Sequence, residues 1–235
     1  MASVDANYKF IYCDVGCNGR VSDAGVFAAC SLNAKLSQNT ANLPHPDALP
    51  GTGEVCSYHM VADDAFPLRD DIMKPYPFRK STKEQLIFNY RLSRAWSVVE
   101  NAFGILANRF RVFLTTITVD VAKVDKLVMA ACALHNYLLS ESEAQYLTPT
   151  LIDQEDTESH SINLGSWRIC QMQPASIPHN NNATVAAKSK RELLTKYTAI
   201  HRKVKLPGST SWYSPNIQGG PKMAQFLVHL NFIKY

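Results

Sequence analysis

"IFNYRLSRAWSVVENAFGILANRF", residues 87–110, is the stretch of sequence that decides the fold. Its apolar residues recur at steps of three and four, the spacing that places side chains on one face of a helix. These residues are Leu92, Trp96, Val99, Phe103, Leu106 and Phe110. The stretch therefore predicts a long amphipathic helix that packs its apolar stripe against the rest of the protein.

Glu100 is a single carboxylate at the edge of this apolar stripe. Gly104 lies one turn further along the same edge, where the missing side chain lets another backbone or a ligand approach. Arg91, Arg94 and Asn101 fall on the opposite side of the predicted helix, which we expect to face outward. Glu100 is then either an ordinary border charge on a surface helix or a metal ligand held on a rigid helix beside a cleft.

The chain around this helix predicts further short elements separated by loops rich in proline and glycine. The predicted elements are a strand over 8–16, a helix over 22–36 with Ser22 as its N-cap, loops over 42–51 and 74–78, a short strand within 56–68 that runs into Asp63 and Asp64, an apolar helix over 121–139 and a short helix over 188–197.

The length of 235 residues corresponds to one domain plus extensions, and a hydrophobic content of 46% is enough for a packed core. No run approaches the roughly 18 consecutive apolar residues of a membrane span. The N-terminus lacks the basic flank and apolar stretch of a secretory signal. The six cysteines form no CxxC pair, so we expect free thiols in a reducing compartment.

The net charge of +4 conceals two basic blocks. Residues 69–126 hold 11 basic and 6 acidic side chains, and residues 186–235 hold 9 basic side chains and one acidic one. Such blocks suit a protein that neutralises phosphates, but solvated surface helices carry the same pattern, so both interpretations stay open. The lysines and arginines of the second block could also help nuclear import.

Several classes of catalytic site are excluded, because the sequence has no G-x-S-x-G, H-E-x-x-H, P-loop or zinc-deaminase pattern. His135 lies within the predicted apolar helix, which favours a structural histidine bonded to a carbonyl over a metal ligand. Asp63 at a strand end and Glu100 on a helix edge remain, and paired carboxylates of this kind can hold Mg²⁺. Aspartates after a strand are also common as turn residues or helix caps, so the pattern alone leaves both interpretations open.

Five blocks, in order, resemble the PIF/Harbinger transposase family and the transposase-derived nucleases related to it, over about residues 4–139. The blocks are "DANYKFIYCDVGCNGRVSDAGVF" (5–27), "LPHPDALPG" (43–51), "VADDAFPLRDDIMKPYP" (61–77), "IFNYRLSRAWSVVENAFGILANRFRVF" (87–113) and "ACALHNYL" (131–138). "GSWR" (165–168), with the helix that ends at Tyr197, is similar to the C-terminal extension of that family.

The resemblance implies an α/β fold of the RNase H-like type, a mixed sheet flanked by helices. It also implies an Asp-Asp-Glu triad that binds two divalent cations, Mg²⁺ or Mn²⁺, for hydrolysis and strand transfer on DNA. We expect the protein in the nucleus, with the cytoplasm as the alternative. Carried over by position, the second aspartate is Asp63 and the glutamate is Glu100. Asp64 takes a neighbouring non-catalytic place, and Asp23 matches a family aspartate that we interpret as support for a helix start.

The resemblance also concerns partners. Arg91, Arg94 and Arg109 fit contacts with phosphates, and we expect weak, non-specific binding of DNA. A protein partner is possible, and neither a membrane nor a small-molecule cofactor is expected.

The family places its first aspartate on an initial strand, in a motif like I-D-G-x-H, which is absent from this sequence. We therefore expect a truncated endonuclease domain over 2–139 that exposes a sheet edge where the first strand should lie. We also expect an acidic and polar extension over 140–197 and a poorly ordered basic tail without family match over 198–235. Two functions follow: a DDE-type DNA endonuclease impaired by the missing aspartate, or a non-enzymatic transposase fragment that binds nucleic acid or a protein partner.

Overall fold

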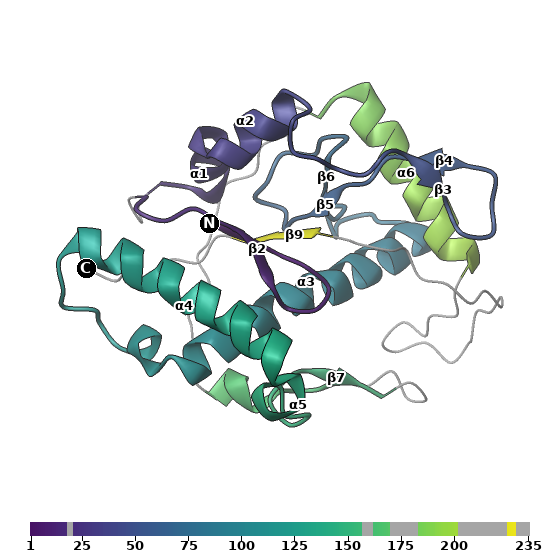
Figure 1. The fold of residues 1–235 in the computed structure, drawn as a ribbon. Coiled ribbons are helices and arrows are strands. Elements are labelled where there is room, and N and C mark those ends of the chain that lie inside the picture. The colour runs from purple at the N-terminus through teal and green to yellow at the C-terminus, as the bar shows by residue number, and fades with distance from the viewer. Residues whose placement is uncertain (18–20, 157–161, 170–182, 202–224, 229–235) are drawn as a thin grey trace.

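The computed structural model describes residues 1–17, 21–156, 162–169, 183–201 and 225–228 (Figure 1). The helices are α1 (Asp23–Ala29), α2 (Ser31–Ser37), α3 (Lys83–Arg109), α4 (Val121–Glu141), α5 (Glu143–Tyr146) and α6 (Val185–His201), with short 3₁₀ turns η1 (Arg111–Leu114) and η2 (Ser166–Ile169). The strands are β1 (Ala2–Val4), β2 (Phe10–Cys13), β3 (Asp47–Ala48), β4 (Val55–Cys56), β5 (Met60–Val61), β6 (Ile72–Met73), β7 (Gln154–Glu155), β8 (Ile162–Asn163) and β9 (Gln225–Val228).

The main sheet has five strands in the order β2-β1-β9-β5-β6. β1 and β2 form an antiparallel hairpin, while β5 and β6 run parallel. β9 joins the two pairs, because it lies antiparallel to β1 and parallel to β5. The sheet edge that we expected to be open beside β1 is therefore covered by residues 225–228 of the same chain. Most of the tail over 198–235, which we expected to be poorly ordered, lies outside the described residues, but this part of it forms the central strand.

Helices cover both faces of the sheet, as Figure 1 shows with α1 and α2 on one side and α3 and α4 on the other. The strands distribute their side chains accordingly, since neighbours along a strand point to opposite faces. In β5, Met60 packs into the core formed with α1 and α2, and Val61 packs into the core formed with α3, α4 and α6. Ile72 and Met73 divide in the same way. The fold is thus a mixed α/β arrangement of three layers.

The long helix predicted from residues 87–110 is confirmed as α3. It begins with a capping box, in which the Thr82 hydroxyl accepts a hydrogen bond from the Gln85 backbone N–H at 3.3 Å. The Gln85 side chain returns the bond by accepting from the Thr82 N–H at 3.0 Å. This exchange satisfies two of the donors that a helix start leaves without partners.

The other predicted helices are also present, with changes at their boundaries. Ser22 caps α1 as predicted, but the helix expected over 22–36 is divided because Cys30 has an extended backbone and starts α2. The short helix expected over 188–197 is longer, since α6 begins at Val185 and ends at His201. The predicted loop over 42–51 contains the two-residue strand β3, which pairs with β4.

Two polar residues of α4 attach this helix to the β1–β2 hairpin. The Asn136 side chain accepts from the Phe10 N–H and donates to the Phe10 carbonyl, both at 2.8 Å. His135 is fully buried, with its Nε2 2.8 Å from the Tyr8 carbonyl oxygen and its Nδ1 2.8 Å from the Tyr146 hydroxyl. Because a carbonyl only accepts, Nε2 carries the proton and Nδ1 accepts from Tyr146. The prediction of a structural histidine bonded to a carbonyl is confirmed.

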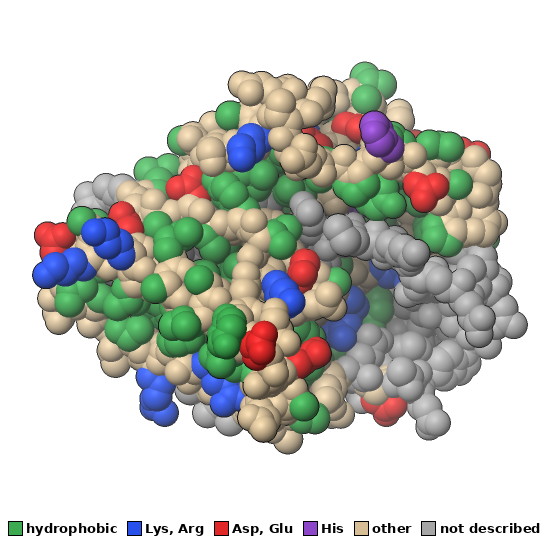
Figure 2. All heavy atoms as spheres, in the orientation of Figure 1, with side chains coloured by type: hydrophobic (Ala, Val, Ile, Leu, Met, Phe, Trp, Pro, Cys, Tyr) green, Lys and Arg blue, Asp and Glu red, His purple; other side chains and the backbone are tan. Residues whose placement is uncertain are grey.

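The outer face of α4 carries apolar side chains in contact with solvent. Met129, Leu134 and Tyr137 are 46%, 50% and 60% exposed, and hydrophobic side chains gather over α4 in Figure 2. Within the part of the chain that the structure describes, no helix has the length and apolarity needed to cross a membrane. The described cysteines are free thiols, in agreement with the sequence analysis.

Candidate active site

Asp63 lies two residues after β5, at the end of a strand near the centre of the sheet. Its Oδ1 accepts a hydrogen bond from the Ala65 N–H at 2.9 Å, which fixes the carboxylate at the start of the turn that follows. The strand and the turn together hold the side chain half-buried. The structure therefore places Asp63 on rigid backbone, as a ligand or catalytic group requires.

The electrostatic surroundings of Asp63 disfavour its charged form. The pKa of Asp63 is raised to about 6, mainly by burial and in part by the neighbouring Asp23 and Asp64. The Ala65 N–H and the charge of Lys74 act in the opposite direction. Asp23 is itself buried at the start of α1, and burial raises its pKa as well. Two acids kept close together at a cost in stability are typical of a functional site.

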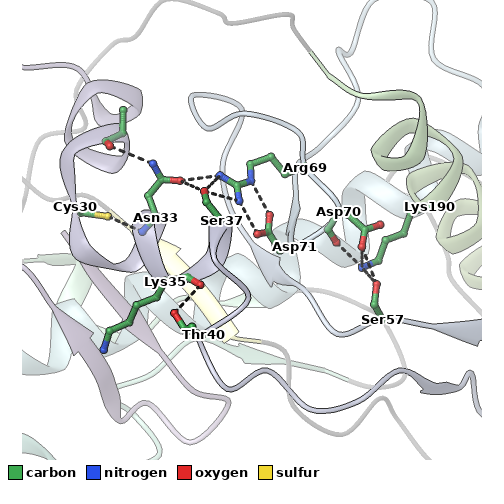
Figure 3. A network of polar contacts seen from close by, with 11 residues as sticks. Cys30, Asn33, Lys35, Ser37, Thr40, Ser57, Arg69, Asp70, Asp71 and Lys190 are labelled. Atoms are coloured by element: carbon green, nitrogen blue, oxygen red, sulfur yellow. Dashed lines mark hydrogen bonds and ion pairs between the residues drawn. The ribbon is translucent and has the colours of Figure 1, made fainter.

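The loop that carries Asp63 is tied to α2 and α6 by two cations, shown in Figure 3. The Arg69 guanidinium pairs with Asp71, with Nη2 2.7 Å from Oδ2, and its Nη1 donates to the Asn33 side chain on α2 at 2.7 Å. From α6, the buried Lys190 ammonium donates to the Ser57 hydroxyl at 2.7 Å and to the Asp70 carbonyl. These bonds position the segment between β5 and β6, and hence Asp63.

Glu100 lies on α3, where the structure gives its carboxylate a cationic partner. Arg168 Nη2 is 2.8 Å from Glu100 Oε2 and 2.6 Å from Asp153 Oδ2. The Asp153 side chain is almost fully buried, whereas the Glu100 side chain is 40% exposed. The pKa of Asp153 lies below its usual value, because the bonds from Arg168 and the Gly165 N–H outweigh the effect of burial, which acts to raise it. Arg168 thus bridges an anchored buried acid and the more exposed Glu100.

The segment that holds Arg168 covers a face of α3 that we expected to be exposed. Asn101 was predicted to face outward, but it is 1% exposed. Its side-chain oxygen accepts from the Trp167 indole N–H at 2.6 Å and from the Asp153 N–H at 3.1 Å. Trp167 lies so close to Gly104 that a Cβ atom added there would be 2.2 Å from the ring. The close approach expected at Gly104 is confirmed, and the approaching group is an indole ring.

The three arginines predicted to contact phosphates have different surroundings. Arg109 is exposed, but its guanidinium donates to the carbonyl oxygens of Gln145 and Tyr146 and so holds α5 against the end of α3. Arg94 lies close enough to Asp153 to help lower the pKa of that acid. Arg91 is half-buried on α3. Their predicted contact with nucleic acid stays a prediction.

In the structure Asp23 and Asp64 lie near Asp63. Glu100 pairs with Arg168 of the C-terminal extension, and Arg168 also pairs with Asp153. Within the described ranges, no three acidic, histidine or cysteine side chains come close enough together to hold a metal ion. Asp23 was predicted only as support for a helix start, not as part of the site. Arg168 was within the quoted "GSWR" stretch, but no spacing in the sequence indicates that it pairs with Glu100.

Comparison with known proteins gives a match to one family model and to one relative, but to no solved structure. A family model described as DDE superfamily endonuclease matches residues 1–136. An Arabidopsis thaliana protein named "Protein ALP1-like" is 25% identical over 169 residues, which are 69% of this chain and 39% of the relative. The chain therefore spans about two fifths of the length of that relative. No solved structure gives a significant match.

The family model covers more than half of the chain, and its match includes Asp63, Glu100, the first four blocks that carry the resemblance to the PIF/Harbinger transposases and most of the fifth. The chain belongs to the DDE superfamily endonuclease family.

Proposed function

We propose that this chain is a transposase-derived, DDE-type endonuclease domain that binds DNA and has lost or impaired cleavage. The observation that carries the proposal is Asp63, in a chain matched by the endonuclease family model. This acid stands at the end of β5 with its pKa raised to about 6, beside the buried Asp23. At neutral pH a carboxyl group with this pKa is mostly ionised, and a bound cation would stabilise the charged form.

The order of the strands supports an RNase H-like fold for the domain. That fold is a mixed sheet flanked by helices, and the sheet here has an antiparallel pair, a parallel pair and a central strand between them. β9 lies where we expected the missing first strand, next to β1 and β5. Asp63 follows the strand beside this position, as a triad member should.

The proposed cofactor is Mg²⁺ or Mn²⁺, and the acids beside β5 fit such an ion in part. Asp63 and Asp23 supply hard oxygen donors, and a divalent cation would relieve the repulsion between their charged forms. Glu100, the other predicted ligand, pairs through its Oε2 with Arg168, and within the described residues it forms no metal-binding group with these two acids. When bound, the metal would polarise the phosphodiester and activate the attacking water.

Impaired cleavage follows from the acids that this chain brings to the sheet. β9 consists of Gln225, Phe226, Leu227 and Val228, none of which is acidic. Asp5, an acid near the hairpin, accepts from the N–H groups of Asn7 and Lys9 at 2.8 and 2.9 Å and so forms the β1–β2 turn. We find no described carboxylate in the place of the first triad aspartate, which would bridge two metal ions.

A plasmid assay tests this part of the proposal. Purified full chain is incubated with supercoiled plasmid and Mg²⁺ or Mn²⁺, beside an Asp63→Ala/Glu100→Ala double variant. We expect equal, negligible nicking from both proteins, because loss of one ligand misaligns the attacking water. Nicking by the wild type that is absent from the double variant would show that the chain cleaves DNA.

The second candidate, a non-enzymatic protein that binds nucleic acid, is favoured by the pairing of Glu100 with Arg168. Both candidates predict non-specific DNA binding in the nucleus through the basic blocks over 69–126 and 186–235. Because bound lysines and arginines release counterions from DNA, the affinity should fall steeply between about 50 and 200 mM salt. Affinity that stays constant over this range would contradict binding through these blocks.

A further inference from the structure

A hollow of about 640 Å³ opens beside Asp63 and has no role in the function proposed so far. Its walls come from the turn after β5, the loop over 74–79, α3 and α6. A volume of this size is within the range of sites that take small organic ligands, about 300–1,000 Å³. The question is which chemistry its walls would recognise.

Three aromatic side chains line the hollow: Tyr76, Phe78 and Trp96. Phe78 is 78% exposed, so its ring contributes little to the core of the fold. It follows Pro77 and Pro75, whose fixed φ angles restrict the loop and limit the directions in which Phe78 can point. Trp96 projects half-buried from the middle of α3. Exposed rings on a restrained backbone are suited to stacking against a planar ligand.

Basic side chains outnumber acidic ones in the lining, with Lys74, Arg79, Lys188 and Arg191 against Asp63 and Asp64.

Arg191 is a cation of the lining that the loop over 74–79 holds in place. Its guanidinium lies over the Tyr76 ring at 3.9 Å, and its Nη1 donates to the Pro75 carbonyl at 3.3 Å. The Arg191 Nε is buried and has no hydrogen-bond partner among the described residues. A buried donor left without a partner is costly, so such groups usually serve a ligand or a function.

Aromatic faces beside several cations match a nucleotide, which combines a planar base with an anionic phosphate. A base within a duplex is stacked on both faces and cannot offer one to a protein ring. The ligand is therefore an unpaired nucleotide, such as one at a strand end or one turned out of the helix.

We propose that the hollow binds one unpaired nucleotide, with its base against Phe78 and Trp96 and its phosphate at Lys188 and Arg191. The class of ligand follows from the hollow alone. The statement that this nucleotide belongs to the DNA strand that Asp63 faces rests on the function proposed above.

The test measures binding by the full chain to three fluorescent probes: a blunt duplex, the same duplex with unpaired nucleotides at one 3′ end, and a deoxyadenosine monophosphate analogue. 2-Aminopurine at the unpaired position reports stacking through quenching. Phe78→Ala and Lys188→Gln alter the hollow. Tyr137→Ala and Lys35→Gln are matched controls, because Tyr137 is a 60% exposed aromatic and Lys35 is an exposed lysine on α2, both outside the lining and outside the two basic blocks.

We expect the wild type to bind the duplex with unpaired nucleotides about tenfold more tightly than the blunt duplex, with 2-aminopurine quenched. Phe78→Ala should reduce this affinity about five- to tenfold, toward the affinity for the blunt duplex, because one stacked base contributes about this much or more. Lys188→Gln should weaken it less, and both controls should bind as the wild type does. Because Phe78 is exposed, its replacement should leave the fold intact, and circular dichroism of each variant checks this directly.

The remaining outcomes separate this inference from the proposed function. Equal binding of both duplexes, unaffected by Phe78→Ala, overturns the hollow as a nucleotide site and leaves DNA binding standing. Binding of the mononucleotide that depends on Phe78, without binding of either duplex, supports the hollow and overturns the proposed function. Absence of binding to all three probes overturns both.

Discussion

Asp63 shows how a single residue links stability to the proposed site. Its carboxyl has a pKa of about 6 in the folded protein, above the ordinary value of 3.8, so folding disfavours the charged form. The cost is fully present above pH 6 and disappears as the pH falls toward 3.8. A residue that is kept charged against this cost is better explained by binding of a cation than by packing.

Asp63→Asn should therefore stabilise the protein. Asparagine keeps the oxygen that accepts from the Ala65 N–H but removes the charge, so we expect a gain of about 1–3 kcal/mol at pH 8. The gain should vanish near pH 4, and urea denaturation at both pH values measures it. Glu54→Gln, at an exposed position, is the control and should change little at either pH. Loss of stability in Asp63→Asn at pH 8 would show that the charge is structural.

Titration of His135 changes the stability in the opposite direction to that of Asp63, because a fall in pH destabilises the folded protein. Burial lowers its pKa to about 4, below the usual 6.5, so the folded protein holds the neutral ring while the unfolded chain takes up a proton. Stability should fall by about 3 kcal/mol as the pH drops from 6.5 to 4, with no effect above that range. We expect His135→Gln to be less stable at pH 7 but to have a flatter profile of unfolding free energy against pH. Parallel profiles for both proteins would contradict the assigned role of His135.

For single residues, the sequence indicated the role of a side chain more reliably than the residues that it contacts. His135 could be predicted as structural, because a histidine inside an apolar helix needs a local acceptor. Asn101 could not be placed correctly, since helical periodicity describes only one packed face and residues 151–153 and 165–168 cover another. Arg168 and Glu100, which form an ion pair, are 68 residues apart in the sequence, and no local pattern encodes such a contact.

At the scale of elements, the C-terminal extension packs against α3 and bonds to its side chains. Trp167 and Asp153 both donate hydrogen bonds to Asn101, and Arg168 forms a salt bridge with Glu100. The extension therefore holds the helix that carries the predicted triad glutamate in place. Gly104 permits this packing because any larger residue would collide with the Trp167 ring. The sequence predicted α3 and a close approach at Gly104 but not the identity of the approaching segment.

Arg168→Gln should detach this extension. The change leaves the Asp153 carboxylate buried without its cation, which typically costs about 3–5 kcal/mol. Urea denaturation measures the loss, and faster proteolysis within residues 151–169 locates it. Lys196→Gln is the matched control, because it breaks an exposed pair with Glu192 at 3.0 Å that contributes at most about 0.5 kcal/mol. Equal stability of the two variants would show that Arg168 does not anchor the extension.

On the scale of the whole molecule, the fold depends on a strand that local sequence patterns did not reveal. Residues 225–228 have no sustained periodicity around them, so we assigned them to a tail. Strand pairing is a long-range interaction, and β9 meets β1 across more than 220 residues of chain. The strand over 8–16 and the short strand that runs into Asp63 were predicted, whereas β6 and the pairing of the strands through β9 were not.

The central position of β9 leads to the last prediction. A chain that ends at His201 would leave β1–β2 and β5–β6 as separate two-stranded pairs, each with a newly open edge. Isolated pairs are marginally stable and open edges recruit other strands. We therefore expect this truncation to lose cooperative urea unfolding and to elute as soluble aggregates in size-exclusion chromatography with light scattering.

A chain that ends at Val228 keeps β9 and serves as the matched control. It should remain monomeric and unfold cooperatively, which separates loss of the strand from loss of the last residues. If the chain that ends at His201 is also monomeric and cooperative, β9 is not a structural strand of the sheet. In that case the position between β1 and β5 would be open to a strand from another chain, and such a strand could carry the acid that β9 lacks.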